Sequence, residues 1–397
     1  MNTMNRHLEP ADFSLVLGGP LYRFWLRIGL ADDTLELVGR RIVLLAGLGW
    51  VPLLLLSIAA GQAWGASVAL PFLHDIEIHL RLLVAVPLLL IAELIVHRRM
   101  GAVARQFVER GLISDSGWER FEAAIASVVR LRNSKTAEAL LIAFVYGVGV
   151  LFIWRTQVAL DLRSWYGTHA GGILQPSLAG WWFGLVSLPL FQFLLLRWYF
   201  RLFIWARFLW RVSRIDLNFM PKHPDGAGGA GFLARASYAF QPLLLAQGVL
   251  LAGTIANRIF YTGAELLEFK PELIGMVAVM IFVILGPLLF FSPKLEAAKR
   301  AGLRQYGTLV ERYMREFDDK WVRGTTALDE PLVGSPDIQS LADLGNSYAV
   351  VKTMRWVPFT LQNILYMAAT ALLPVLPLTL TMFPVEELLD RLLKILF

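Results

Sequence analysis

Long apolar runs dominate the chain, and each is about the length that a helix needs to cross a bilayer. About 20 apolar residues cover ~30 Å of hydrocarbon at ~1.5 Å per residue. Segments of this kind occupy residues 42–60, 82–96, 137–154, 181–200, 239–260, 273–291 and 361–382. The runs are continuous rather than alternating, which is the pattern of helices. The sequence therefore predicts an all-α polytopic membrane protein with about seven transmembrane helices and a cytoplasmic helical layer.

The fourth run continues past the point where it should leave the bilayer. No helix breaker follows Pro189, so residues 181–214 predict one helix about 50 Å long. Its second half carries five arginines, namely Arg197, Arg201, Arg207, Arg211 and Arg214. At ~100° per residue they fall within an arc of roughly 140°. This basic stripe predicts a surface that binds anions or lipid headgroups.

The polar segments between the runs give the domain organisation. It comprises a cytoplasmic N-terminal segment with an interfacial helix (1–41), membrane helices 1 and 2 (42–96), cytoplasmic amphipathic helices (97–136), membrane helices 3 to 6 (137–292) with the long helix 181–214 and the glycine-rich loop 221–232, cytoplasmic helices (293–356), and membrane helix 7 with an amphipathic tail (357–397). The prolines in the last run allow it to cross the bilayer or to dip in and return, and crossing is favoured.

Local signals predict where several of these helices begin and end. Ser116 and Glu119 have the spacing of a capping box at the start of the second amphipathic helix. Ser335 is followed by Pro336, a pattern typical of a helix N-terminus. The glycine at Gly345 predicts the end of that helix.

Composition and charge agree with a membrane location and set its orientation. Hydrophobic residues make up 56% of the chain, charged residues 17%, and the mean hydropathy is +0.57. Of the 37 lysines and arginines, 29 lie in segments 1–41, 97–136, 201–237 and 293–356, which the positive-inside rule places in the cytoplasm. We therefore predict a bacterial inner-membrane protein with a cytoplasmic N-terminus. The charge is spread over many loops, so nucleic-acid binding is not expected.

The glycine-rich loop 221–232 is the most distinctive short motif. Its candidate site residues are His223, Asp225, Gly226, Gly228 and Gly229. The glycines satisfy a dinucleotide-binding pattern, but a helix precedes them instead of a strand, so the match is taken as accidental. A tight turn in which the aspartate accepts hydrogen bonds from nearby backbone groups is favoured over a ligand site.

Few polar side chains interrupt the apolar runs. Glu93, Gln192, Gln247 and Asn257 are among them, and hydrogen bonding between helices is their expected role, with pore lining as the alternative. On the outer side, His74, Asp75 and His79 are weak metal candidates because no third strong ligand is spaced to join them. The absence of cysteine excludes thiolate metal sites and disulfides, and no cofactor or catalytic motif is predicted.

Three stretches carry a resemblance to a family. Residues 223–229 (HPDGAGG), 197–207 (RWYFRLFIWAR) and 338–346 (IQSLADLGN) resemble an uncharacterised family of bacterial multi-pass inner-membrane proteins. The resemblance implies the same location for this chain and no particular activity.

Three functions are consistent with these patterns. The leading hypothesis is an oligomeric channel or permeation protein whose arginine stripe attracts anions at the cytoplasmic mouth. The alternative is a non-transporting scaffold or sensor that binds anionic lipid headgroups and a cytoplasmic protein partner. The third is an enzyme acting on a lipid-linked phosphate near His223 and Asp225. Membrane lipids and further copies of the chain are the expected partners.

Overall fold

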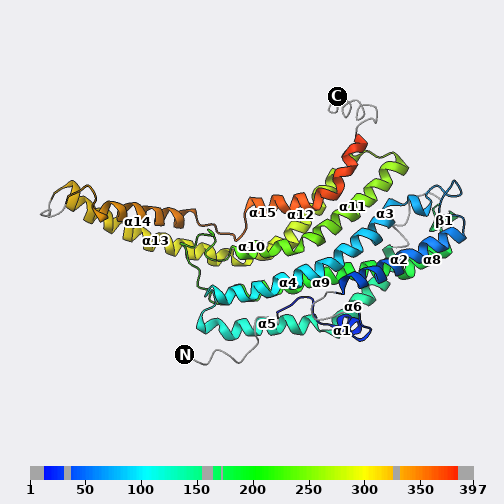
Figure 1. Ribbon diagram of the computed structural model, residues 1–397, viewed down its shortest axis with the longest axis horizontal. Coiled ribbons are helices and arrows are strands. Elements are labelled where there is room, and N and C mark those ends of the chain that lie inside the picture. Colours follow the sequence, from blue (N-terminus) through cyan, green and yellow to red (C-terminus); the bar gives the residue numbers. More distant parts are fainter. Residues whose placement is uncertain (1–12, 31–36, 154–163, 171–172, 325–330, 383–397) are drawn as a thin grey trace.

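The computed structural model describes residues 13–30, 37–153, 164–170, 173–324 and 331–382, and these form an elongated bundle of helices (Figure 1). Six helices in the described residues are long and apolar enough to cross a membrane: Val38–Ala59, Ile76–Glu109, Leu178–Ser213, Phe232–Thr262, Leu266–Val322 and Leu361–Met382. The predicted all-α membrane fold is confirmed.

The remaining predicted span, 137–154, is helical as far as the description reaches. It begins as α6 (Lys135–Phe144) and continues as a π-helical segment (Val145–Ile153). Ser134 caps its N-terminus by accepting a hydrogen bond from the backbone N–H of Ala137. Its end falls outside the described residues, so this seventh span stays a prediction.

The fourth apolar run forms one continuous rod, as predicted. It starts as α8 (Leu178–Trp182), passes through a π-helical turn (Phe183–Ser187) and continues as α9 (Leu188–Ser213). Its 36 residues span about 54 Å, well beyond the hydrocarbon thickness. A second long rod consists of α3 (Ile76–His79), a π-helical segment (Leu80–Ala85) and α4 (Val86–Glu109).

At one end of these rods, three predicted cytoplasmic segments meet, and we call this the α5 end. Helix α5 (Trp118–Arg132) packs along α9, where Phe121 lies 6.2 Å from the ring of Phe208. The backbone N–H of Asn218 donates to Leu112 O (2.9 Å), and the Lys294 ammonium donates to Ile215 O. Segments that are distant in sequence thus form one layer.

The other end, which we call the β end, brings together segments that lie between the predicted cytoplasmic ones. Strand β1 (Gly167–Ala170) pairs antiparallel with β2 (Ile173–Pro176), with Thr168 opposite Gln175. Leu70 forms a bridge with Ser164, and the Tyr261 hydroxyl donates to His74 O (3.1 Å). The two strands were not predicted from the sequence.

A second group of helices covers the rods. It contains α2 (Val38–Ala59), α10 (Phe232–Ser237), α11 (Gln241–Thr262), α12 (Lys270–Leu285), α15 (Leu361–Leu372) and the 3₁₀ segment Leu373–Met382. Helices α11 and α15 approach closely at Gly248, where any side chain would collide with the α15 backbone at Ala371.

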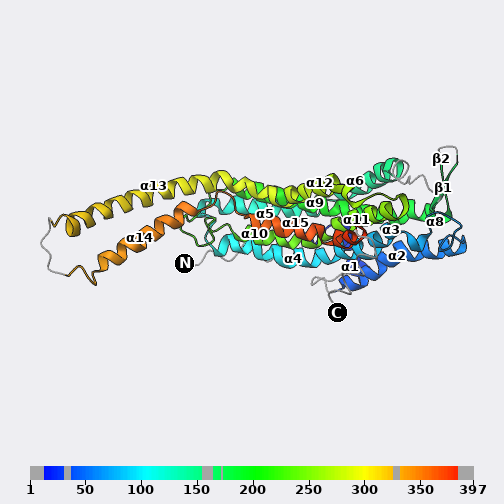
Figure 2. The same ribbon diagram turned by 90° about the horizontal axis from the view of Figure 1, so that it is seen from above.

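Beyond the α5 end, two helices project from the body as a hairpin (Figure 2). They are α13 (Ser292–Phe317), which ends in a π-helical turn (Asp318–Val322), and α14 (Pro336–Thr353). The Tyr313 hydroxyl donates to Asp337 O (3.1 Å), and Tyr348 packs over Gly307. We call this pair the α13–α14 hairpin.

Two of the predicted helix signals are wrong and one is confirmed. Ser335 caps α14 by accepting from the backbone N–H of Asp337, as expected. However, α14 does not end at Gly345 but runs on to Thr353. The N-cap of α5 is Gly117 rather than Ser116, and no side-chain cap forms there.

Candidate functional site

Two arginines of the predicted stripe lie inside the protein, in an ion-pair cluster around Glu93. Arg201 Nη2 lies 2.8 Å from Glu93 Oε1, and Arg197 Nη1 lies 3.5 Å from the same oxygen. Arg41 Nη1, from the first turn of α2, lies 2.8 Å from Glu93 Oε2. All four side chains are less than 10% exposed. The cluster fastens α2, α4 and α9 to one another.

A second carboxylate links this cluster to α6 and to the N-terminal helix α1 (Pro20–Arg27). Arg197 Nε lies 3.7 Å from Glu138 Oε1, and Glu138 Oε2 accepts from the backbone N–H of Leu21 (2.9 Å). Asn133 Oδ1 accepts from the N–H of Gly19 (2.9 Å). Glu138 thereby anchors the start of α1, whose first-turn N–H groups need acceptors.

The cluster lies near the boundary of the apolar region. Counting from Leu178 at ~1.5 Å per residue, Arg197 is about 29 Å along the rod, close to the full hydrocarbon thickness. Three arginines face two carboxylates, so one positive charge is in excess. Within the described residues, Nε and Nη2 of Arg41 are buried and make no hydrogen bond. We call these five side chains the boundary cluster.

The other three arginines of the stripe lie along the α5 end of α9. Arg207 and Arg211 are half-buried and Arg214 is exposed. Arg211 Nη1 donates to Ala123 O of α5 (3.5 Å), and the guanidinium of Arg214 lies 5.5 Å from the Trp210 ring. The structure thus divides the predicted stripe into two buried arginines that are ion-paired and three arginines that keep exposed surface.

The loop 221–232 is a compact turn built around Asp225, as the favoured interpretation predicted. Asp225 Oδ1 accepts from the N–H groups of Ala227 (2.8 Å) and Gly229 (3.1 Å), and Oδ2 accepts from Gly231 N–H (2.8 Å). His223 Nδ1 lies 3.0 Å from Oδ1. Burial by itself would raise the pKa of Asp225, but the three N–H donors and His223 hold it below its ordinary value.

This turn also fastens neighbouring elements. Gly226, Gly228 and Gly229 have φ values of 61°, 63° and 97°, which glycine adopts without strain. Arg355, just after α14, donates to Asp225 O (2.7 Å), and its own N–H donates to Gly226 O (2.7 Å). Arg110 at the end of α4 donates to Gly229 O (3.1 Å). Because both carboxylate oxygens are occupied, the loop is a structural junction at the base of the hairpin.

The polar residues within the spans have different surroundings. Asn257 makes the expected interhelical contacts: its Nδ2 donates to Asp75 Oδ1 (2.8 Å), and its Oδ1 accepts from the N–H of Ile76 (3.1 Å). Gln192 packs against Gly149 of the α6 extension. Among the described residues, Gln192 Oε1 and Gln247 Nε2 are buried without a hydrogen-bond partner.

The outer candidates His74, Asp75 and His79 belong to a hydrogen-bonded network at the β end. Asp75 Oδ2 accepts from Trp165 Nε1 (2.8 Å), in addition to the bond from Asn257. His79 Nδ1 accepts from Trp50 Nε1 (2.9 Å), and His79 Nε2 faces Leu73 O (3.3 Å). No group of three metal-ligating side chains is found in the part of the chain that the structure describes. These residues hold α2, α3, α11 and the 164–167 segment together.

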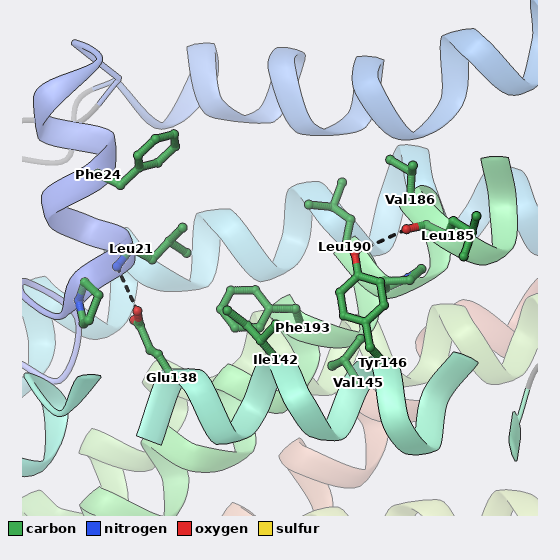
Figure 3. A pocket seen from close by; sticks show the side chains of 12 residues that line it. Leu21, Phe24, Glu138, Ile142, Val145, Tyr146, Leu185, Val186, Leu190 and Phe193 are labelled. Atoms are coloured by element: carbon green, nitrogen blue, oxygen red, sulfur yellow. Dashed lines mark hydrogen bonds between the residues drawn. The ribbon is translucent and has the colours of Figure 1, made fainter. Parts of the chain in front are cut away.

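A lateral groove next to the boundary cluster was not predicted from the sequence. It encloses about 550 Å³ between α1, α6 with its π-helical extension, and the first half of the α8–α9 rod (Figure 3). Leu21, Ile142, Leu190 and Phe193 contribute its apolar wall, and Glu138 lies at one end. A smaller cavity of about 10 Å³ is also lined by Glu138, together with Arg197 and Arg201. It has room for about one water molecule.

Comparison of this chain with protein-family models, with curated proteins and with solved structures finds no match. Any functional assignment therefore depends on the geometry described above.

Proposed function

We propose that this protein is an oligomeric scaffold of the bacterial inner membrane, and that the α13–α14 hairpin joins two copies in the cytoplasm. The observation that carries the proposal is a strip along the outer face of α14 that is exposed and uncharged, with the exposed Lys352 and Asp343 to either side of it. Ile338, Ala342, Gly345, Ala349 and Thr353 are all exposed. At about 100° per residue they fall within an arc of roughly 80°.

The outer side of α13 is different, and the contrast supports the proposal. It carries ion pairs between successive turns, such as Arg312 with Glu316 (3.0 Å) and Arg315 with Glu311 (3.8 Å). Their side chains are 63–77% exposed, which is typical of a surface that stays in water. The strip on α14 has no such ion pairs, although it is also exposed.

Symmetry favours a second copy as the occupant of this face. Copies in one membrane share an orientation, so a two-fold axis along the membrane normal would place two α14 helices parallel, with each residue near its own equivalent. A charged face would then meet its own charges, whereas a neutral face has no such cost. Small residues such as Ala342, Gly345 and Ala349 would allow close approach of the two backbones.

The distribution of basic residues supports the orientation. Three of the segments that are rich in lysine and arginine meet at the α5 end, whereas the β end gathers loops that are poor in them. By the positive-inside rule the α5 end and the hairpin belong in the cytoplasm.

Disulfide trapping tests the scaffold proposal directly, because the chain has no cysteine of its own. In oxidised membranes, Ala342→Cys and Ala349→Cys should each give a covalent dimer, since two thiols join when their Cα atoms are within about 7 Å. Thr308→Cys, on the outer side of α13, is the matched control and should remain monomeric. Failure of both α14 variants to cross-link, or equal cross-linking of the control, would refute the proposal.

A second candidate function is an anion channel, and one observation favours it. In the described residues, Arg207, Arg211 and Arg214 have no carboxylate within 4.0 Å, in contrast to Arg197 and Arg201. An accessible basic group at a cytoplasmic mouth would concentrate anions. Arg207→Gln and Arg211→Gln should then change the anion-to-cation flux ratio of reconstituted vesicles, while Arg312→Gln on the hairpin should not. The same surface would also suit anionic headgroups.

A further inference from the structure

We propose that the groove between α1, α6 and α9 is a binding site for one acyl chain of an anionic phospholipid. We call it the α1–α6–α9 groove. Its volume of about 550 Å³ lies within the range of small-molecule sites, which is roughly 300–1,000 Å³. In Figure 3 the side chains of Leu21, Ile142, Leu190 and Phe193 converge on it from all three elements.

The groove lies at hydrocarbon depth. From Leu178 at ~1.5 Å per residue, the lining residues Leu185 to Phe193 are about 10–23 Å along the rod. Glu138 closes the end of the groove that adjoins the boundary cluster. The long direction of the groove therefore follows the direction of lipid chains, and its charged end coincides with the headgroup region.

The groove opens to the outside of the protein rather than being sealed. The side chains at its rim are apolar yet exposed: Phe24 is 52% exposed, Ile142 47% and Leu185 44%. Val145, at 1% exposure, is part of its floor. An open apolar surface at this depth contacts lipid chains, so hydrocarbon is its natural occupant.

The polar atoms of the groove are already engaged, which also favours an acyl chain. The Tyr146 hydroxyl donates to Leu185 O (3.3 Å), as Figure 3 shows. Glu138 accepts from Leu21 N–H and pairs with Arg197. The remaining wall offers only apolar surface to a ligand.

The charge around the end of the groove determines which headgroup it attracts. The boundary cluster has one more arginine than carboxylates, and α1, the helix that Glu138 anchors, carries the exposed Arg23 and Arg27. Arg23 Nε is bonded to Gly19 O (3.4 Å), which leaves its other N–H groups for a phosphate. A net positive rim at the headgroup level attracts anionic lipids over zwitterionic ones.

The test compares two tryptophan variants of α6 in nanodiscs. The discs contain equal amounts of phosphatidylglycerol and phosphatidylcholine with identical chains, and bound lipids are counted by native mass spectrometry after release. Ile142→Trp fills the groove, whereas Leu140→Trp, on a side chain that is 65% exposed and outside the groove, is the matched control. Excluding even two methylene groups lowers affinity about tenfold.

We expect the wild type and Leu140→Trp to retain one phosphatidylglycerol and Ile142→Trp to retain at least about tenfold less. Equal retention in the two variants, or loss in both, would refute the groove as the site. The double variant Arg23→Gln with Arg27→Gln should still bind a lipid but lose the preference for phosphatidylglycerol. The control variant Arg312→Gln should retain that preference. An undiminished preference in the double variant would refute the assignment of an anionic headgroup.

Discussion

Removing the charge of Glu93 should destabilise the protein more than removing any exposed carboxylate. Glu93→Gln keeps the shape of the side chain but leaves Arg41, Arg197 and Arg201 with no anion except Glu138, which reaches only Arg197. Three guanidinium groups would then repel one another inside the bundle. The boundary cluster joins α2, α4, α6 and α9, so its disruption should loosen all four.

The size of the expected loss of stability follows from the burial of the cluster. Breaking a buried ion pair by removing one partner costs about 3–5 kcal/mol, because the remaining charge has lost both water and its counter-ion. Glu93 and its three partners are all below 10% exposure, so this range applies. The pair Glu77–Arg81, at 27% and 18% exposure, is the comparison. Its loss should cost closer to the ~0–1 kcal/mol of surface pairs, because both side chains keep part of their contact with water.

Unfolding by SDS in mixed micelles, followed by near-ultraviolet circular dichroism, would measure the difference. Glu93→Gln should lower the folding equilibrium constant by about 100-fold or more, and Glu77→Gln by less than about tenfold. Adding Arg201→Gln to Glu93→Gln should recover part of the loss, because the pair is coupled. Equal effects of the two single variants, or strictly additive effects in the double variant, would refute the reasoning.

Three further predictions concern single contacts. Asp225→Asn should lower the free energy of unfolding at neutral pH and make it less dependent on pH in acid. The pKa of Asp225 is depressed in the folded protein, so the ionised carboxylate stabilises the fold fully above the ordinary pKa of 3.8 and this stabilisation is lost as the pH falls below that value. Unfolding measured over a range of pH would show the difference. Asn257→Leu should cost about 1–3 kcal/mol in the same SDS assay, since it removes a donor to the buried Asp75. Gly248→Leu should prevent α11 from packing against α15 and so reduce the yield of folded protein in size-exclusion chromatography. Gly275→Leu, which has open space around it, should behave as the wild type in the same assay.

The rods and the turn were predictable because their signals are local. An uninterrupted apolar run is enough to predict the 36-residue helix that contains α9. The turn at Asp225 follows from a short polar side chain next to glycines, and its acceptor bonds all reach within six residues. The Ser335 cap is equally local.

Gly345 shows how tertiary contacts override a local signal. A glycine inside a helix costs about 1 kcal/mol relative to alanine, which alone suggests a helix end. Beyond it, however, Tyr348 packs over Gly307 and Val351 packs against Gly302 of α13. This packing outweighs the cost, and α14 continues to Thr353.

The partners of the arginine stripe could not be predicted, because they come from distant parts of the chain. Glu93 is 104 residues from Arg197 and 52 from Arg41. The sequence did contain one indication of this cluster, because Glu93 is a lone carboxylate within an apolar run and such a group needs a cationic partner. Nothing in the sequence specified which of the five arginines would supply it. The α1–α6–α9 groove was equally hidden, because it exists only where α1 docks on Glu138.

The position of the boundary cluster also explains why α9 stays apolar beyond the membrane. Past Arg201 the helix still carries Trp205 and Phe208, both fully buried, and water would be a poor solvent for them. They are covered instead by Phe13, whose ring lies 4.7 Å from Phe208, and by Phe121 of α5. The boundary cluster thus divides the aromatic run: before it the run faces lipid and neighbouring spans, and after it the buried side chains Trp205 and Phe208 form the core of the α5 end. A hydropathy profile records one continuous segment, because protein core and lipid select the same residues.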